Sequence, residues 1–253
     1  MRALHLITAR GGSKGVPGKN LRKICGISLV GFKAISAAKS QHCSRLIIST
    51  DSPAIQAEAR HCGVEVPFTR REELATDEAS SLEVIWDTMQ YIEHETTERY
   101  DALMVLEPSS PFATFHDLDN AVELMERTKA NVVVGVRPVE VHSIFQGPLD
   151  ERSRIGSIVI KLTQTSLRRQ DLPREYTMNG SFYLVRWDFF TRHRKIYVDP
   201  ETTYGYVMDR AYSIEIDEPI DLAWAEFLVA RGDIDLSHWR APTPRFKEAS
   251  VAR

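Results

Sequence analysis

A glycine-rich, basic segment near the N-terminus has the composition of a phosphate-binding loop. It runs from Arg10 to Asn20 with the sequence Arg-Gly-Gly-Ser-Lys-Gly-Val-Pro-Gly-Lys-Asn, and it follows an apolar stretch, residues 3–9, that is typical of a strand. Glycine allows close approach and positive φ angles, and successive backbone N–H groups then form a concave anion site. Arg10, Lys14 and Lys19 add positive charge. The segment predicts polyphosphate binding; the alternative is an ordinary solvated glycine turn.

The spacing of this loop excludes two familiar phosphate-binding motifs. A Walker loop needs a glycine five residues before Gly-Lys-Ser/Thr, whereas here residue 13 is serine and Asn20 follows the Gly-Lys pair. A dinucleotide loop needs Gly-x-Gly, whereas Gly11 and Gly12 are adjacent. The sequence therefore indicates a phosphate loop of another kind.

Two carboxylates near the C-terminus have the spacing of a magnesium site. Glu215 and Asp217 are two residues apart, so in a strand they would lie on the same face. Mg²⁺ binds through one or two carboxylates together with substrate phosphate and water. Taken alone, the two residues favour a solvated strand edge with alternating polar side chains, which is the more frequent origin of such a pattern.

The elements that would position these residues alternate between strand and helix. Strands are predicted at residues 3–9, 46–48, 64–68, 102–106 and 131–136, and helices at 28–41, 53–62, 80–95 and 117–127, with Ser52 as an N-cap. The strands are continuously apolar, which is typical of a parallel sheet covered on both faces. Ligands of such sheets bind beyond the carboxyl ends of the strands, where the glycine loop, Asp51, Glu107 and Asp217 are expected. Asp51 could equally belong to the first turn of the next helix.

The pattern changes after residue 137. Residues 138–178 are irregular, with a hairpin predicted at 156–162, and we interpret them as an excursion from the sheet. Strands at 181–185 and 211–216 and a helix at 220–231 complete a single α/β domain, residues 1–239, and residues 240–253 are expected to be a disordered tail.

Composition restricts the class of protein further. Formal net charge is −3, from 32 basic and 35 acidic residues, which argues against binding nucleic acid by bulk charge. The three cysteines show no Cys-x-x-Cys spacing, and no apolar run approaches the ~18 residues of a membrane span. We therefore expect a cytoplasmic protein with neither a membrane nor a nucleic acid as partner.

Taken together, six short motifs resemble the acylneuraminate cytidylyltransferases, the CMP-sialic acid synthetase family. In chain order they span residues 9–21 (the loop), 48–51 (Ile-Ser-Thr-Asp), 73–81 (Glu-Leu-Ala-Thr-Asp-Glu-Ala-Ser-Ser), 108–111 (Pro-Ser-Ser-Pro), 179–183 (Asn-Gly-Ser-Phe-Tyr) and 214–217 (Ile-Glu-Ile-Asp). The resemblance covers roughly residues 3–228. It implies a mostly parallel, doubly wound, Rossmann-like nucleotidyltransferase sheet with a small dimerisation excursion.

The resemblance also implies roles for particular residues. The implied catalytic residues are Arg10, Lys14 and Asp217. The implied nucleotide-binding residues are Arg10, Gly11, Gly12, Ser13, Lys14, Asn20, Arg70 and Ser81. The implied substrate-binding residues are Glu107, Ser109, Arg169 and Asn179. The family motif at 215–217 is usually Asp-x-Asp, so Asp217 is the expected ligand of Mg²⁺ and Glu215 a ligand or a neighbour of one.

The activity that these features imply is transfer of CMP from CTP to the anomeric C2 hydroxyl of a nonulosonic or related 2-keto-3-deoxy sugar acid, with release of pyrophosphate. No histidine is placed as a general base, so a metal-bound hydroxide or a carboxylate would take the proton. The alternatives are a sugar-1-phosphate nucleotidyltransferase and a catalytically silent nucleotide-binding protein. The resemblance further implies a homodimer in which the excursion reaches over the partner's active site.

The sequence departs from the family on the sugar side. Glu107 replaces a neutral amide, and Phe145 and Thr177 stand where the family carries a lysine and an arginine. A buried carboxylate needs a cation, sugar hydroxyls or a basic nitrogen as its partner, and the two lost cations argue against the first. We therefore expect a substrate other than N-acetylneuraminate, either deaminated or carrying a free basic nitrogen.

We predict that Lys14→Ala lowers kcat by an amount equivalent to roughly 2–4 kcal/mol, because it removes a cation that stabilises charge on the leaving pyrophosphate. Steady-state kinetics check this. A rise in the KM for CTP with kcat unchanged would make Lys14 a binding residue only.

Overall fold

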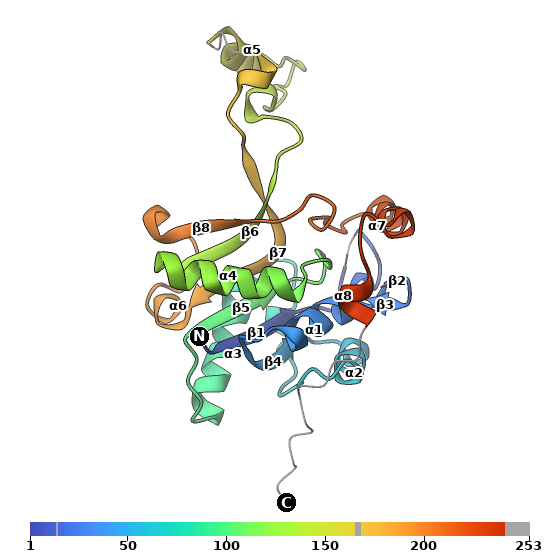
Figure 1. Cartoon of the computed structure of the whole chain (residues 1–253), viewed down its shortest axis with the longest axis vertical. Helices are drawn as coiled ribbons and strands as arrows, with labels where there is room; N and C mark the ends of the chain where they lie inside the picture. Colours follow the sequence, from blue (N-terminus) through green and yellow to red (C-terminus); the bar gives the residue numbers. More distant parts are fainter. Residues whose placement is uncertain (14, 165–167, 241–253) are drawn as a thin grey trace, which may run out of the picture.

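A computed structural model of the chain describes residues 1–13, 15–164 and 168–240 (Figure 1). Within these ranges the strands are β1 (Ala3–Thr8), β2 (Lys23–Ile24), β3 (Ile27–Ser28), β4 (Cys43–Ser49), β5 (Ala102–Leu106), β6 (Val132–Pro138), β7 (Tyr176–Arg186) and β8 (Thr203–Val207). The helices are α1 (Leu29–Lys39), α2 (Pro53–His61), α3 (Ser81–Glu95), α4 (Phe115–Thr128), α5 (Gly156–Thr163), α6 (Trp187–His193), α7 (Pro219–Arg231) and α8 (Ser237–Arg240). Short 3-10 turns occur at Lys19–Leu21, Glu72–Leu74, Ser143–Phe145, Arg169–Asp171 and Pro200–Thr202.

The main sheet has the strand order β4-β1-β5-β7-β6-β8. β1 pairs in parallel with β4 and β5, and β6 pairs in parallel with β8, while β7 runs antiparallel to both β5 and β6. The prediction of a mostly parallel sheet is therefore confirmed. Because β4, β1 and β5 are parallel neighbours, their carboxyl ends meet at one edge, and the segments that follow them lie together there.

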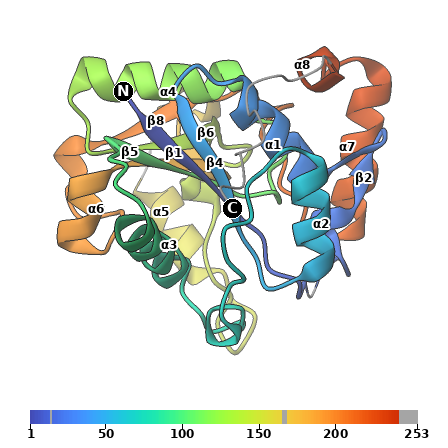
Figure 2. The same ribbon diagram turned by 90° about the horizontal axis from the view of Figure 1, so that it is seen from below.

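Helices cover both faces of this sheet, as predicted for a doubly wound fold. On β4 the side chain of Ile48 packs with α1, α2 and α4, whereas that of the preceding Ile47 packs with α3 and α6. On β5, Leu106 packs on the same face as Ile48, and the preceding Val105 packs on the same face as Ile47. Figure 2 shows α3 and α4 on opposite sides of the sheet. Continuous apolar strands are the consequence, because both faces are buried.

Helix starts follow the local sequence. The Ser52 side chain accepts a hydrogen bond from the backbone N–H of Ile55, which confirms the predicted N-cap of α2. Ser80 and Glu83 form a reciprocal capping box at the start of α3. This cap fixes where the preceding segment of the chain enters α3, next to Ser81.

A third apolar cluster joins the C-terminal helices to the rest of the molecule. Trp239 of α8 is almost fully buried, and its ring makes edge contacts with Phe32 of α1 and Phe112. Its Nε1 donates a hydrogen bond of 2.8 Å to the Ser36 hydroxyl. Phe112 directly follows the segment 107–111 at the end of β5, so this cluster also holds that segment in place.

Three sequence predictions of secondary structure are wrong. Residues 64–68 make only one isolated pairing with β4, through Glu65, because Pro67 has no N–H to continue a ladder. Residues 211–216 are not a strand: β8, which was not predicted, occupies the place beside β6, and Ile216 packs in the third cluster. Residues 156–162 form helix α5 and not a hairpin; the helical turn brings Lys161 Nζ to the carbonyl oxygens of Ser143 and Gln146.

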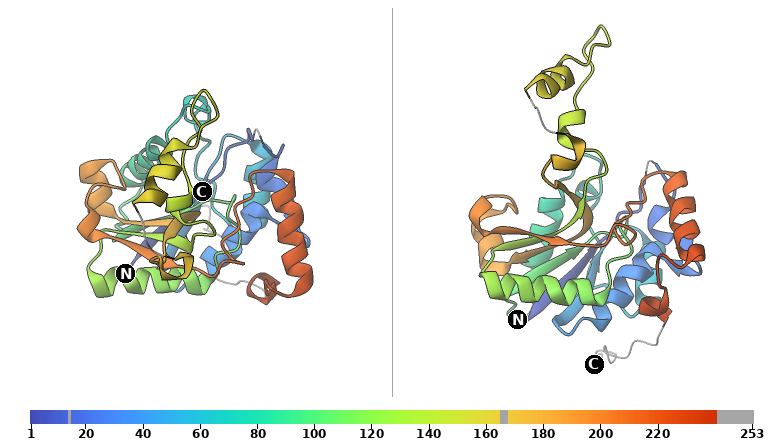
Figure 3. Two further views of the ribbon diagram at one scale, coloured as in Figure 1. Left: turned by 90° about the horizontal axis from the view of Figure 1, so that it is seen from above. Right: turned by 45° about the horizontal axis from the view of Figure 1, so that its top comes forward.

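The segment between β6 and β7, residues 139–175, projects from the body of the molecule (Figures 1 and 3). We call it the arm. It contains α5, which buries none of its side chains, and it exposes Phe145, Val159 and Ile160 among other apolar residues. The arm corresponds to the predicted excursion, with its ends shortened because β6 and β7 pair as far as Pro138 and Tyr176. Arg240, expected in the tail, belongs to α8, and the rest of the predicted tail lies outside the described residues.

Within the described ranges, no helix has both the length and the apolar character required to cross a bilayer.

We predict that Trp239→Ala lowers the free energy of unfolding by about 3–5 kcal/mol, because it leaves a cavity between α1 and α8 and removes the hydrogen bond to Ser36. Chemical denaturation measures this. Trp224→Ala is the matched control: Trp224 is 50% exposed, so a change of less than about 1 kcal/mol is expected. Equal losses in both variants would contradict the role given to the third cluster.

Candidate functional site

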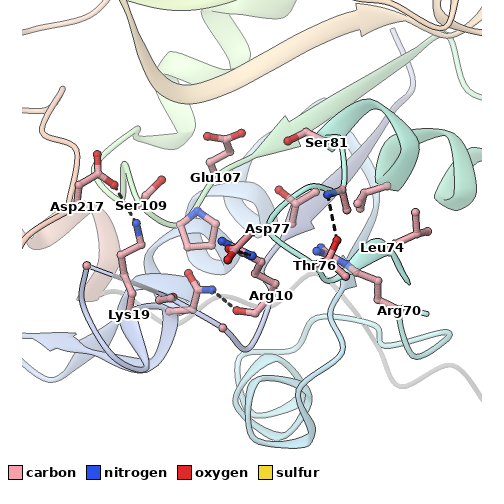
Figure 4. Close-up of a pocket in the computed structure, with 18 residues that line it drawn as sticks. Arg10, Lys19, Arg70, Leu74, Thr76, Asp77, Ser81, Glu107, Ser109 and Asp217 are labelled. Carbon is pink, nitrogen blue, oxygen red and sulfur yellow. Dashed lines mark hydrogen bonds and ion pairs between the residues drawn. The ribbon is translucent and has the colours of Figure 1, made fainter. Parts of the chain in front are cut away.

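A cavity of about 500 Å³ opens at the carboxyl ends of β1, β4 and β5. Its walls are the loop after β1, the segment 70–84, the residues after β5 and the residue Asp217 before α7 (Figure 4). The lining residues are Thr8, Arg10, Gly12, Ser13, Gly15, Lys19, Asn20, Arg70, Leu74, Thr76, Asp77, Ala79, Ser81, Val84, Glu107, Pro108, Ser109 and Asp217. The cavity lies where the sheet topology predicts a ligand site.

The glycine loop is in close contact with both neighbouring walls. A Cβ on Gly15 would lie 2.1 Å from the carbonyl oxygen of Asp217, so only glycine permits this approach. On the other side, the backbone N–H of Gly11 donates a 2.8 Å hydrogen bond to Asp51 Oδ1. Asp51 therefore anchors the loop, and it is Ser52 that caps α2. Asp51 neither lines the cavity nor belongs to the first turn of α2, the two places that the sequence left open for it.

The loop cations are held by carboxylates of the opposite walls. An Arg10 guanidinium nitrogen lies 2.6 Å from Asp77 Oδ1, and Lys19 Nζ lies 3.0 Å from Asp217 Oδ1. The Asn20 side chain donates to the backbone carbonyl of Arg10 and so fixes the curvature of the loop. These ion pairs are partly exposed and are each worth little. A bound polyphosphate can therefore displace the carboxylates from Arg10 and Lys19 at small cost.

The end of the cavity farthest from Asp217 is formed by residues 70–84. Arg70 is 5% exposed and donates to both the hydroxyl and the carbonyl oxygen of Ser49, at 3.0 and 2.6 Å. Burial lowers the pKa of Arg70 to about 10, and it stays charged at neutral pH. Ser81, at the first turn of α3, and the apolar Leu74 complete this wall. A positive charge beside apolar and hydroxyl surface suits a nucleoside.

The opposite end carries the carboxylates. The N–H of Ile216 donates a 2.7 Å hydrogen bond to the carbonyl of Ser109, which fixes Asp217 beside the end of β5. Glu215 lies against Gly180, where an added Cβ would be 2.4 Å from its Oε1. Although residues 211–216 are not a strand, Glu215 and Asp217 both lie exposed on either side of the buried Ile216. Of the two, Asp217 lines the cavity and Glu215 does not.

Burial and neighbouring charges alter the ionisation of this end. Burial raises the pKa of Glu107 to about 7, against the opposing attraction of Lys33. Partial desolvation of its carboxylate, although the residue as a whole is exposed, together with repulsion from Asp217, also raises the pKa of Glu215. Lys33 of α1 is fully buried, donates from Nζ to the Ser181 carbonyl at 2.9 Å, and has its pKa lowered to about 7 by burial. Within the described ranges no cation forms an ion pair with Glu107, but Lys33 and Lys19 oppose the rise in its pKa through their charge, so the two cations lost from the family positions are not the only ones that could act on it.

The structure brings most of the predicted site residues together, but not all. Those that line the cavity are Arg10, Gly12, Ser13, Asn20, Arg70, Ser81, Glu107, Ser109 and Asp217. Asn179 is fully buried away from it: its side-chain amide donates to Ser213 and Met208, and its Oδ1 accepts from the N–H of Ser181. Arg169 lies in a 3-10 turn of the arm, and Lys14 lies outside the described residues.

Two residues of this region, Asp77 and Lys33, were missed from the sequence, and Lys19 was recognised as a loop cation but not assigned a site role. Lys19 and Asp77 both lie within recognised motifs, so their position was a usable signal. Lys33 gave none, because a lysine in an amphipathic helix is usually solvated. Only the packing of α1 against β7 and α4 shows that it is buried.

The donor set at the carboxylate end fits Mg²⁺. In the described part of the chain, no group of three histidine, cysteine or acidic side chains is arranged to hold a metal ion by itself. Mg²⁺ does not need such a cage, because substrate phosphate and water supply the rest of its shell. Asp217 presents a largely exposed carboxylate to the cavity, and the pKa of Glu215 is raised partly by Asp217. A bound cation would relieve the repulsion between these two carboxylates.

A doubly wound sheet with a glycine-rich anion loop facing carboxylates defines a nucleotide-binding α/β protein of the nucleotidyltransferase type. A family model described as Cytidylyltransferase matches residues 4–228, and the chain belongs to this family. A CMP-N,N'-diacetyllegionaminic acid synthase of Legionella pneumophila is 31% identical over 234 residues, covering 90% of this chain and 97% of that protein. An N-acylneuraminate cytidylyltransferase of Escherichia coli is 28% identical over 88% of this chain and 51% of its own length. The resemblance found in the motifs is confirmed.

Comparison with solved structures supports the fold. A structure of CMP:2-keto-3-deoxy-manno-octonic acid synthetase complexed with CTP superposes with a TM-score of 0.66 at 16% identity, covering 92% of this chain and 100% of that one. At this level of identity the likeness concerns the fold, which confirms the Rossmann-like class.

We predict that Glu107→Gln stabilises the protein at pH 8 but not at pH 4.5. The folded-state pKa of Glu107, about 7, lies above its ordinary value of 4.5, so the carboxylate destabilises the fold increasingly as pH rises through that window. The expected gain is about 2 kcal/mol at pH 8. Denaturant unfolding of both proteins at the two pH values measures it. A difference between them that does not change with pH would contradict the burial of this charge.

Proposed function

We propose that this protein transfers CMP from CTP to the anomeric C2 hydroxyl of a nonulosonic or related 2-keto-3-deoxy sugar acid and releases pyrophosphate. The observation that carries the proposal is the cavity itself: a glycine loop with cations faces carboxylates across a space suited to a nucleotide, in a chain that belongs to the cytidylyltransferase family. The relatives named for CMP-sugar synthesis match along nearly the whole of this chain. A cytoplasmic location agrees with the use of CTP.

In this proposal the loop holds the triphosphate. Backbone N–H groups of residues 12–15 and the side chains of Arg10 and Lys14 would contact the phosphates and stabilise charge on the departing pyrophosphate. Arg70 and Ser81 would hold the nucleoside at the other end. Because the reaction is mostly positioning and charge neutralisation, groups fixed before the substrate binds are its main requirement.

Asp217, with Glu215 beside it, would hold Mg²⁺. When bound, the ion would supply Lewis-acid polarisation of the α-phosphate. Lys19 Nζ donates a hydrogen bond to one carboxylate oxygen of Asp217. A cation bound there would release Lys19 to the phosphates, so the two positive charges need not compete for one carboxylate.

The test is a pyrophosphate-release screen of CTP with Mg²⁺ against a panel of acids and controls. The panel contains N-acetylneuraminate, a deaminated analogue, a legionaminic acid, 2-keto-3-deoxy-octonate and a sugar 1-phosphate. We expect release with at least one keto-acid sugar. Release only with the sugar 1-phosphate would favour a sugar-1-phosphate nucleotidyltransferase, and release with none would favour a silent nucleotide-binding protein.

The preferred sugar is expected to differ from N-acetylneuraminate because Glu107 replaces a neutral amide of the family. The expectation was also based on the loss of two cations at Phe145 and Thr177. Because Lys33 and Lys19 attract Glu107, that loss no longer supports it, and the expectation depends on the carboxylate of Glu107 alone. A highest kcat/KM for N-acetylneuraminate within the panel would contradict it.

We also propose that the arm mediates a homodimer and reaches over the partner's cavity. Support comes from its projection out of the body and from its exposed apolar residues, such as Phe145, Val159 and Ile160. The prediction is a hydrodynamic mass of two chains at assay concentration. A mass equal to one chain of 28.8 kDa would contradict it, and Val159→Asp should shift the protein toward that smaller mass.

Asp217→Asn keeps the size of the side chain but removes the charge that would hold Mg²⁺. We predict that turnover falls at least ~10²-fold, about 2.7 kcal/mol of transition-state stabilisation. CTP affinity measured without metal, by calorimetry, should hardly change. A near-normal turnover would remove Asp217 from the mechanism.

A further inference from the structure

Three carboxylates line the cavity, and two of them have a cationic partner. Asp77 pairs with Arg10 and Asp217 pairs with Lys19. The Glu107 carboxylate has no such partner: within the described ranges it makes no side-chain hydrogen bond and no ion pair. It follows directly after β5, in the middle of the sheet, and Figure 4 shows it along the cavity wall between Asp217 and Ser81.

The titratable groups whose charge is coupled to Glu107 come from five parts of the fold. Lys33 of α1 and Lys19 of the loop attract its charge, while Glu215 and Asp217 before α7 repel it. Two phenols are also coupled to it, those of Tyr183 on β7 and Tyr197, whose pKa values are raised by burial and then by Glu107. Both phenols are therefore neutral near pH 7. The effects of the neighbouring positive and negative charges on the pKa of Glu107 therefore partly cancel.

The proposed reaction requires an acceptor for one proton. The attacking sugar hydroxyl must lose its proton as the bond to the α-phosphorus forms, and efficient acceptors titrate near the working pH. No residue that lines the cavity is a histidine. Asp77 and Asp217 are engaged in ion pairs with Arg10 and Lys19. Glu107 lines the cavity without an ion pair, and burial raises its pKa, so it is the remaining acceptor among the described residues of this cavity.

We propose that Glu107 is the general base of the reaction, an inference that rests on the proposed function. Its carboxylate takes the proton from the C2 hydroxyl of the sugar acid while that oxygen forms a bond to the α-phosphorus of CTP. The bond between the α-phosphorus and the bridging oxygen breaks, and pyrophosphate leaves with the bonding electrons. The neutral Glu107 then gives the proton to water, which restores the carboxylate.

A position for Lys33 follows from the same geometry. Its ammonium group is fixed by the Ser181 carbonyl and does not line this cavity, so it acts on Glu107 through charge alone. It is a positioning residue, whose positive charge opposes the rise in the pKa of Glu107 that burial causes.

The experiment compares wild type with Glu107→Gln, Glu107→Asp and the control Glu123→Gln, which alters an exposed residue of α4. Rates of pyrophosphate release are measured from pH 5.5 to 8.5 with the best sugar acid of the panel. In wild type, kcat should rise with pH across this range and level off as Glu107 becomes fully ionised. In Glu107→Gln, kcat should fall at least ~10²-fold and lose this rise, with the KM for CTP unchanged. Glu107→Asp should keep the rise at a lower rate.

The outcomes separate this inference from the proposed function. Absence of pyrophosphate release from wild type with every sugar acid would refute the function. Release from wild type, together with a Glu107→Gln variant that keeps the pH-dependent rise or changes only the KM for the sugar, would refute Glu107 as base and leave the function intact. CTP binding by Glu107→Gln, measured by calorimetry, verifies that a slow variant is folded.

Discussion

The close contact between Gly15 and the backbone of Asp217 is the constraint on which the site depends. A side chain at residue 15 would overlap the Asp217 carbonyl, since even a Cβ would lie 2.1 Å from it. Through this contact the anion loop of the first strand is held beside a carboxylate that arrives two hundred residues later. The Asp217 segment is itself fixed by the Ile216 hydrogen bond to Ser109 and by burial of Ile216 in the third cluster. The packing of α7 and α8 thus determines the geometry of a site to which they contribute no side chain.

Most of the charged side chains of the cavity are already paired with one another before the substrate binds. Binding would exchange their partners and would not create unpaired buried charge. Arg10 and Lys19 each face a carboxylate in the free protein. Phosphate oxygens can replace those carboxylates at the cations, and a divalent cation can replace Lys19 at Asp217. Glu107 is outside this exchange, and its burial is a cost to stability. Such a cost is common at functional sites, where a group is kept in an ionisation state that the fold alone would not favour.

Much of this fold could be predicted from the sequence because its signals are local. The apolar runs at β1, β4 and β5 and the Ser52 cap each reflect interactions within a few residues. The wrong predictions arose where the secondary structure of a segment is determined by its contacts with residues distant in the sequence. Residues 211–216 have the composition of a strand, but β8 occupies the place beside β6, and α5 was taken for a hairpin because its apolar residues are β-branched.

In the candidate site, likewise, residues within local motifs could be predicted, whereas the surroundings that depend on distant packing could not. Arg10, Ser13 and Asp217 were found because they lie in motifs, and they line the cavity. Asn179 lies in a motif as well, yet its side chain is committed to Ser213 and Met208 inside the fold. Lys33 could not be found from sequence, because its burial depends on the packing of α1 against the sheet. The environment of Glu107, and therefore its chemistry, became visible only with Lys33 in place.

The position of bound CTP tests the central claim most directly. A crystal structure of the protein with CTP and Ca²⁺, a slow substitute for Mg²⁺, should show the triphosphate against the backbone of residues 12–15. The base should lie near Arg70 and Ser81, and the metal on Asp217. Arg10 and Lys19 should have moved from Asp77 and Asp217 to phosphate oxygens. A nucleotide bound elsewhere, or bound here with the triphosphate directed away from the loop, would contradict this assignment of the cavity.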